Sequence, residues 1–174
     1  MPGMKDTTGK DNYELVPLHF VNRILNTPVE PLPLEETQGV LLFCITEDFY
    51  ANTLCRLFKA LFECSSASLY HLNQAYKIGA IKYEPHNWQK GIPTYKLLMA
   101  CLRHLHAAEC AKLSGEVTDP SEALNIADYI GTDIQPASHY GHVMWGVLTC
   151  LWYSEYQEDY VQMAPADAQY EENK

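Results

Sequence analysis

Residues 47–64 read EDFYANTLCRLFKALFEC, and this stretch decides the fold class of the chain. Its apolar side chains recur at the i, i+3, i+4, i+7 and i+8 positions that form one face of an α-helix. They are Leu54, Leu57, Phe58, Leu61 and Phe62. A helix with one apolar face must bury that face against another element. The stretch therefore predicts a helix inside a packed domain.

Helical patterns recur on both sides of this stretch. The predicted segments are a short helix over residues 13–25, a helix over 67–80, a long helix over 93–114, a short helix over 119–131 and a last helix over 138–156. The apolar run 40–46 (VLLFCIT) fits either a buried helix or a strand, and periodicity does not separate the two. Because no second convincing strand accompanies it, we predict an all-α bundle of four or five main helices.

Prolines and charge mark the two ends of the predicted bundle. We interpret residues 1–34 as a flexible leader and a Pro-rich linker, since three closely spaced prolines disfavour helix there. Residues 35–157 form the predicted bundle, and residues 158–174 form an acidic tail.

Composition limits the function classes. The chain has 174 residues, 47% of them hydrophobic, which suits one domain with a substantial core. Its net charge of −10 argues against nucleic-acid binding, which depends on basic contacts to phosphates. No apolar run reaches the ~18 residues that a membrane span needs, and the six cysteines lack a CxxC pair. We therefore expect a soluble cytoplasmic protein with reduced thiols, in the host cytoplasm if its source is viral.

The segment 82–91 (KYEPHNWQKG), which we call the 82–91 loop, joins two predicted helices and is too specialised for a plain connector. Its candidate binding residues are Lys82, Tyr83, Asn87, Trp88 and Lys90. Lysines bind phosphate oxygens, an amide reads a polar edge, and an aromatic ring stacks on a base or sugar. The alternative is a tryptophan that caps the core, with both lysines solvated. The loop thus predicts a nucleotide clamp or a helix connector.

Two histidine patterns follow the loop. Arg103 and His104 are adjacent on the long helix, where arginine suits bidentate phosphate contacts and His104 lies on the inward-facing stripe. His139 and His142 share one face of the last helix through i, i+3 spacing. Such imidazoles bind Mn²⁺, Co²⁺ or Zn²⁺, or serve as a general base. The alternative is that these histidines pack in the core or begin the helix.

An acidic segment, residues 115–122 (GEVTDPSE), precedes the short predicted helix. Glu116, Asp119 and Glu122 are the oxygen ligands that Mg²⁺ or Mn²⁺ prefers. Helix capping explains two of these residues without a metal, because Asp119 suits the N-cap and Glu122 the third helical position. Both interpretations stay open on the residues alone.

Taken together, these pieces resemble a known family. The run 75–91 (AYKIGAIKYEPHNWQKG), then Arg103-His104-Leu105, then Gly115-Glu116-x-x-Asp119-Pro120, then His139-x-x-His142 is similar to the phage and bacterial dATP/dGTP diphosphohydrolases. These belong with the MazG-like all-α nucleotide pyrophosphohydrolases. The similarity covers roughly residues 70–155 and implies a MazG-like bundle that forms a homo-oligomer, a dimer or tetramer.

The resemblance also implies an activity. It implies cleavage of a purine deoxynucleoside triphosphate, dGTP or dATP, to the monophosphate and pyrophosphate with two or more Mg²⁺ or Mn²⁺ ions. The chain looks like the branch that remodels the nucleotide pool of phages with 2-aminoadenine DNA. Nothing in the residues separates guanine from adenine. The chain departs from the family at residues 123–138, which lengthen the path to the last helix, and at Gly146, where the family commonly has Asn.

The resemblance gives each candidate a role. Catalysis falls to His104 and His142, while nucleotide binding falls to Lys82, Tyr83, Asn87, Trp88, Lys90 and Arg103. The implied metal ligands are Glu109, Glu116, Asp119, Glu122 and His139, with Glu109 supplied by a longer helix than the family's. Two rival interpretations are a helical interaction module without enzymatic activity and a structural zinc protein that uses His106, Cys110, His139 and His142.

Overall fold

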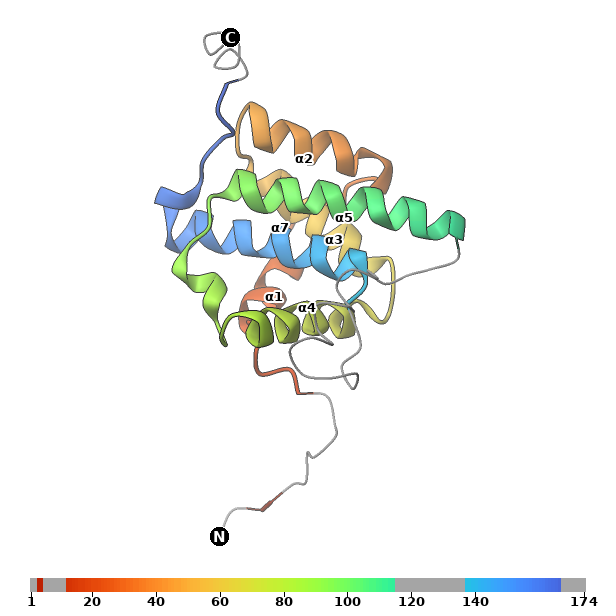
Figure 1. Cartoon of the computed structure of the whole chain (residues 1–174), viewed down its shortest axis with the longest axis vertical. Helices are drawn as coiled ribbons and strands as arrows, with labels where there is room; N and C mark the ends of the chain where they lie inside the picture. Colours follow the sequence, from red (N-terminus) through yellow and green to blue (C-terminus); the bar gives the residue numbers. More distant parts are fainter. Residues whose placement is uncertain (1–2, 5–11, 115–136, 167–174) are drawn as a thin grey trace.

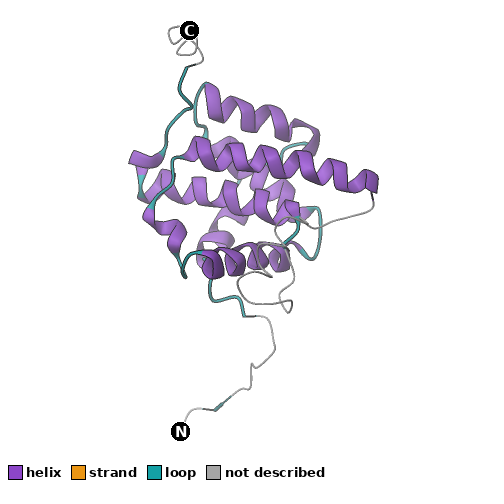
Figure 2. Ribbon diagram, in the orientation of Figure 1, coloured by secondary structure: helices purple, strands orange, loops and turns teal. Residues whose placement is uncertain are grey.

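The computed structural model describes residues 3–4, 12–114 and 137–166. Over these ranges the chain forms α-helices and short 3-10 turns without a β-strand (Figures 1 and 2). The helices are α1 (Leu18–Leu25), α2 (Thr37–Thr46), α3 (Ala51–Glu63), α4 (Ser68–Lys82), α5 (Thr94–Ser114) and α7 (His139–Tyr156). The predicted all-α bundle is confirmed, and α1 lies within the short helix predicted over residues 13–25. The helix predicted over 119–131 lies outside the described residues.

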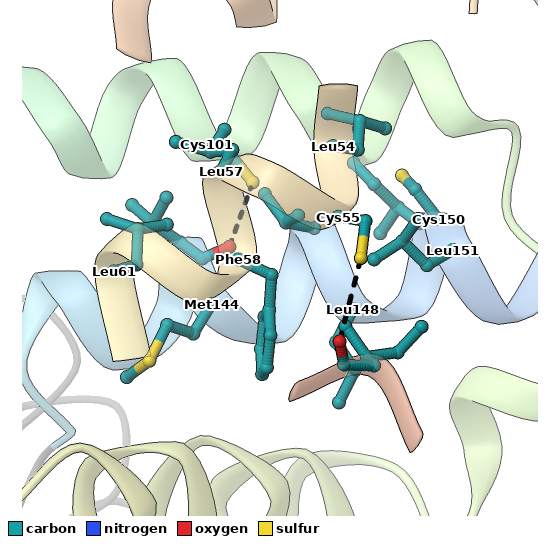
Figure 3. Packing of buried hydrophobic residues seen from close by; sticks show 14 of the residues in the cluster. Leu54, Cys55, Leu57, Phe58, Leu61, Cys101, Met144, Leu148, Cys150 and Leu151 are labelled. Atoms are coloured by element: carbon teal, nitrogen blue, oxygen red, sulfur yellow. Dashed lines mark hydrogen bonds between the residues drawn. The ribbon is translucent and has the colours of Figure 1, made fainter. Parts of the chain in front are cut away.

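Helix α7 forms the centre of the bundle and packs against α3, α4 and α5 (Figure 1). Eleven of its eighteen residues are buried, which suits a helix that is apolar on nearly all sides. Figure 3 shows its Met144 and Leu148 among side chains of α3, including Leu57 and Phe58. The amphipathic stretch that predicted the fold therefore packs its apolar face on the central helix.

The apolar run 40–46 is part of helix α2, so the choice between helix and strand is resolved. Leu41, Cys44 and Ile45 are buried, whereas Leu42 and Phe43 are exposed on the outer side. A strand would also need a partner strand, and the described residues offer none.

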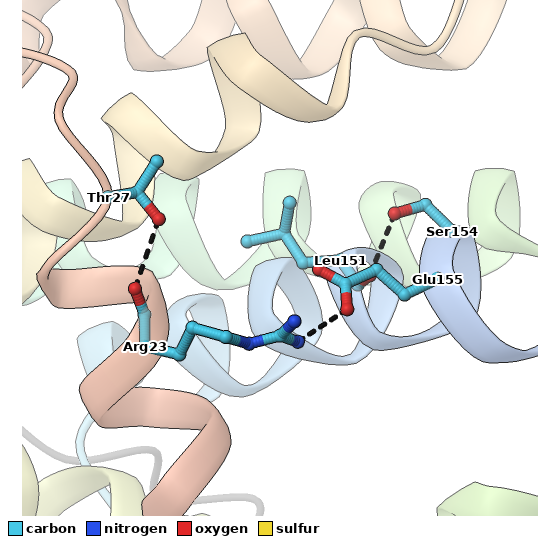
Figure 4. A network of polar contacts seen from close by, with 5 residues as sticks. All are labelled: Arg23, Thr27, Leu151, Ser154 and Glu155. Atoms are coloured by element: carbon cyan, nitrogen blue, oxygen red, sulfur yellow. Dashed lines mark hydrogen bonds and ion pairs between the residues drawn. The ribbon is translucent and has the colours of Figure 1, made fainter.

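The packed unit extends beyond the predicted bundle boundaries at both ends. Phe20 and Ile24 of α1 and Leu32 of the Pro-rich segment belong to the main core cluster, so residues 1–34 are not all leader and linker. Arg23 of α1 also forms an ion pair with Glu155 of α7 (Figure 4). The sequence concealed this packing because prolines interrupt helix but do not prevent burial. The predicted tail likewise begins with an ordered contact, since the Ala164 N–H donates to the Ile45 carbonyl at 2.8 Å.

One cation holds the N-terminal segment on α3. Lys59 is only 9% exposed. Its Nζ donates to the carbonyls of Thr27 at 2.7 Å and Val29 at 2.8 Å. We expect Lys59→Met to lower the free energy of unfolding by about 2–3 kcal/mol, because two partly buried carbonyls lose a charged donor. Chemical denaturation measures this effect, with Lys96→Met on an exposed site of α5 as the control. Equal stability of the two variants would contradict the prediction.

Two glycines of α7 allow its neighbours to come close. A Cβ on Gly141 would lie 2.6 Å from the His71 carbonyl oxygen of α4, and one on Gly146 would lie 2.3 Å from the Cys101 Sγ of α5. The glycine that replaces the Asn of the resembled family thus serves helix packing in this chain.

We expect Gly146→Ala to destabilise the fold by about 1–3 kcal/mol, because the added methyl group overpacks a filled interface. The matched control is Gly39→Ala on α2, where an added Cβ meets nothing within 4 Å. This control removes a glycine from a helix without a clash, so it should be neutral or stabilising by up to about 1 kcal/mol. Thermal unfolding of both variants checks the contrast, and a stable Gly146→Ala protein would contradict it.

A membrane span is not found among the described helices, since none combines sufficient length with sufficient apolar character.

Candidate active site

A pocket of about 520 Å³ lies between α4, α5, α7 and the 82–91 loop. The residues predicted for binding and catalysis that line it are Lys82, Tyr83, Asn87, Trp88, Arg103, His104 and His142. They come from segments up to sixty residues apart along the chain. The structure therefore brings together most of the side chains that the sequence singled out.

The 82–91 loop owes its shape to two residues with positive φ. His86 has φ 62° and precedes the 3-10 turn η2 (Asn87–Lys90), and Gly91 ends the turn with φ 103°. A Cβ on Gly91 would lie 2.1 Å from the Cζ atom of Tyr160, so only glycine fits against this ring. Residues after α7 thus hold the end of the loop in place.

Trp88 anchors the loop in the core. The residue is 6% exposed, and its ring makes edge-to-face contacts with Tyr76 at 5.9 Å and Trp152 at 4.9 Å between centroids. The Tyr153 hydroxyl donates to the Trp88 carbonyl, and burial raises the pKa of Tyr153 to about 12, so this donor stays protonated. Trp88 therefore packs in the core, as the alternative interpretation of the loop predicts, and it also lines the pocket. Tyr83, which is 71% exposed, is the aromatic side chain available for stacking.

The two lysines of the loop are placed differently. Lys82 ends α4 and lines the pocket, whereas Lys90 forms an ion pair with Glu84 and lies outside the pocket lining. Both partners of that pair are largely exposed, so it contributes little to stability. Arg103 of α5 is exposed and lines the same pocket. The cations at the pocket are therefore Lys82 and Arg103.

Three imidazoles meet where α5 approaches the start of α7. The Nδ1 atoms of His104 and His139 are 3.2 Å apart, and the ring of His142 stacks on His104 with centroids 4.4 Å apart and planes 14° apart. Ser138 caps α7 by accepting from the Gly141 N–H at 3.1 Å, which fixes the first turn that carries both histidines. His104 and His142 line the pocket, whereas His139 is 3% exposed and does not.

Of the predicted metal ligands that the structure describes, His139 belongs to this cluster and Glu109 does not. Glu109 is exposed and lines a separate pocket of about 430 Å³ with Glu35 and Tyr140. It follows His104 by five residues, so the two side chains diverge by about 140° around α5. Glu109 therefore lies apart from His104, and its role as a metal ligand stays a prediction. Glu116, Asp119 and Glu122 lie outside the described residues.

The described donors are also insufficient for the alternative zinc site. His106 is exposed two residues from His104, about 200° around the helix, and the Cys110 side chain lies outside the described part. Within the described ranges, no three or more His, Cys, Asp and Glu side chains converge in a way that could hold a metal ion.

Sequence reasoning missed part of the pocket wall. Tyr76 and Trp145 line it and contact each other edge to face at 6.4 Å, and Glu84 adds a carboxylate. Burial raises the pKa of the Tyr76 phenol well above its usual value, so this side chain is uncharged. Tyr76 followed the apolar stripe of its helix, and a tyrosine at such a position gives no signal that distinguishes core from pocket.

The described residues form an α-helical bundle whose pocket is lined by two cationic side chains, two imidazoles from α5 and α7, and aromatic side chains. The model of the family dATP/dGTP diphosphohydrolase, N-terminal, matches residues 57–162, more than half of the chain. The chain therefore belongs to this family of nucleotide diphosphohydrolases, and the resemblance stated above is confirmed. Comparison with curated proteins gives no match, and comparison with solved structures gives none either.

Proposed function

We propose that the protein hydrolyses a purine deoxynucleoside triphosphate, with dGTP or dATP as substrate, to the monophosphate and pyrophosphate. One observation carries the proposal: Lys82, Arg103 and the stacked pair His104 and His142 line a single pocket. Its volume of about 520 Å³ suits a small-molecule ligand. Family membership supplies the reaction class, and the pocket supplies side chains suited to phosphates.

The proposed division of labour follows the pocket walls. Lys82 and Arg103 bind phosphate oxygens from opposite sides, because one ends α4 and the other lies on α5. Asn87 reads a polar edge of the nucleoside, and Tyr83 stacks on its base or sugar. His104 lines the same pocket and takes the proton from the attacking water.

The proposed reaction is a single displacement at the α-phosphorus. A water oxygen forms a bond to this phosphorus while the bond from phosphorus to the bridging β-oxygen breaks, and pyrophosphate leaves. The proton of the water passes to an imidazole nitrogen of His104. Lys82 and Arg103 balance negative charge on the phosphates throughout.

We also propose that Mg²⁺ or Mn²⁺, as two or more ions, supports the reaction. The pocket wall described by the structure offers imidazoles and the single carboxylate Glu84, so further oxygen ligands must come from elsewhere. Glu116, Asp119 and Glu122 are the proposed source, because they follow the end of α5 directly in sequence. A bound divalent ion would lower the pKa of water and neutralise charge on the phosphates.

A substrate panel tests the proposed function. Purified protein is incubated with dGTP, dATP, GTP and dTTP in Mn²⁺ or Mg²⁺, and products are resolved by ion-exchange chromatography and ³¹P NMR. The expected products are a deoxynucleoside monophosphate and pyrophosphate. Orthophosphate as the first product, or no turnover of any nucleotide, would overturn the proposal. The same panel with EDTA tests the metal requirement.

We expect Arg103→Met to raise KM for the substrate by about 10- to 100-fold, because a charged hydrogen bond to phosphate contributes about 1.5–3 kcal/mol. The matched control is Lys90→Met, which removes the same charge from the 82–91 loop but outside the pocket lining. Its KM should stay within about threefold of the parent value. Initial-rate kinetics of both variants check the contrast, and equal effects would mean that only overall charge matters.

The alternative, a non-enzymatic interaction module, finds some support in the exposed apolar side chains Leu42 and Phe43 of α2. Thermal unfolding separates the two functions, because a ligand that binds only the native state raises Tm. A rise in Tm with Mn²⁺ and dGTP together favours the enzyme. The role in a 2-aminoadenine pathway and the homo-oligomer remain proposals, and light scattering checks the second.

A further inference from the structure

His139 contacts His104 but does not itself line the pocket. The two Nδ1 atoms are 3.2 Å apart, within hydrogen-bonding distance, so one ring donates and the other accepts. His104 lines the pocket, whereas His139 is 3% exposed and lies outside the lining. A buried imidazole that contacts a pocket imidazole through one nitrogen resembles the third member of a catalytic triad, which orients the base.

We propose that His139 is a positioning residue that fixes the tautomer of His104. In this arrangement the Nδ1–H of His104 donates to the Nδ1 lone pair of His139. The lone pair of His104 is then on Nε2, the only tautomer in which that nitrogen can accept a proton from water. The inference rests on the proposed function, since it gives His104 the role of base. It also replaces the earlier interpretation of His139 as a metal ligand.

The fold holds the ring of His139 in place beside His104. His139 is the first residue of α7 and is 3% exposed, so the start of the helix and the surrounding core restrict its movement. In the proposed arrangement, when His104 takes a proton at Nε2, its Nδ1–H still donates to His139.

His142 completes the restraint on the His104 ring. Its ring lies parallel to His104 at 4.4 Å, so the plane of His104 is fixed by stacking and its rotation by the contact with His139. The other charged or titratable groups that line the pocket are Lys82, Tyr83, Glu84 and His86 from α4 and the loop, Tyr76 from α4, and Arg103 from α5.

The tautomer can be observed directly. Long-range ¹H–¹⁵N correlation spectra of the full-length ¹⁵N-labelled protein distinguish an Nδ1–H from an Nε2–H imidazole. The His104 signals are assigned by their loss in His104→Gln. The expected result is Nδ1–H for His104, changing to a mixture of tautomers in His139→Leu. An Nε2–H tautomer for His104 in the parent protein would overturn the positioning role.

Kinetics supply the second readout. Asn at position 139 can still place a carbonyl oxygen as acceptor, whereas Leu has no acceptor. We expect His139→Leu to lower kcat by about 10- to 100-fold with KM nearly unchanged, and His139→Asn to recover most of the loss. Equal loss in both variants, or loss in KM alone, would overturn the inference. If the parent protein shows no turnover, the proposed function is overturned instead. The tautomer spectrum can still be measured in that case, because it does not require activity.

Discussion

Replacement of His104 by glutamine is expected to lower kcat for hydrolysis of the preferred nucleotide by about 10²- to 10⁴-fold, the usual contribution of a general base. Glutamine approximates the length of the imidazole and keeps polar atoms near His139, so the pocket should keep its shape. It offers no basic nitrogen at pH 7. KM should change by less than about threefold, because the variant removes an interaction needed for the chemical step and not for binding.

The control for this experiment is His106→Gln, two residues further along α5. His106 is exposed and lies about 200° around the helix from His104, away from the pocket. Its kcat should match that of the parent protein. Similar losses in both variants would show that the effect comes from α5 as a whole. A normal rate in His104→Gln together with a low rate in His142→Gln would transfer the role of base to the stacked ring.

The sequence predicted helices well because their periodicity is a local property. The stripe that includes Leu54, Leu57 and Phe58 required a helix, and the structure places α3 there with all three side chains buried. The 82–91 loop was also informative, since its unusual composition indicated a binding role and most of its candidates line the pocket. The sequence was therefore sufficient to identify pocket residues in a connector whose residue types are unusual for a connector.

The sequence indicated candidate residue types more readily than it indicated where their side chains lie in the fold. Glu109 has a carboxylate suited to a metal ion, but it lies about 140° around α5 from His104 and lines another pocket. Lys90 carries the positive charge that phosphate binding needs, but it forms an ion pair with Glu84 and lies outside the pocket lining. The contact between His104 and His139 joins residues 35 apart in the chain, and no local pattern encodes such a pairing. Each of these outcomes depends on how helices pack and not on their own propensity.

Trp88→Ala is the second change with a large expected effect, and it acts first on stability. The ring is 6% exposed and packs against Tyr76 and Trp152, so its removal leaves a large cavity in the core. We expect the free energy of unfolding to fall by about 3–5 kcal/mol. Tm should fall by about 6–20 °C for a chain of this size. Trp88→Phe should recover part of the loss, because it refills much of the cavity.

The matched control is Tyr83→Ala in the same loop. Tyr83 is 71% exposed, so its removal should leave Tm unchanged within about 2 °C. If Tyr83 stacks on the nucleotide, KM should rise by about 5- to 100-fold, in keeping with about 1–3 kcal/mol per stacked base. The opposite pattern, in which Trp88→Ala raises KM at constant Tm and Tyr83→Ala changes neither, would return the stacking role to Trp88. Differential scanning fluorimetry and initial-rate kinetics on the same protein samples separate these outcomes, because one loop residue carries stability and its neighbour carries binding.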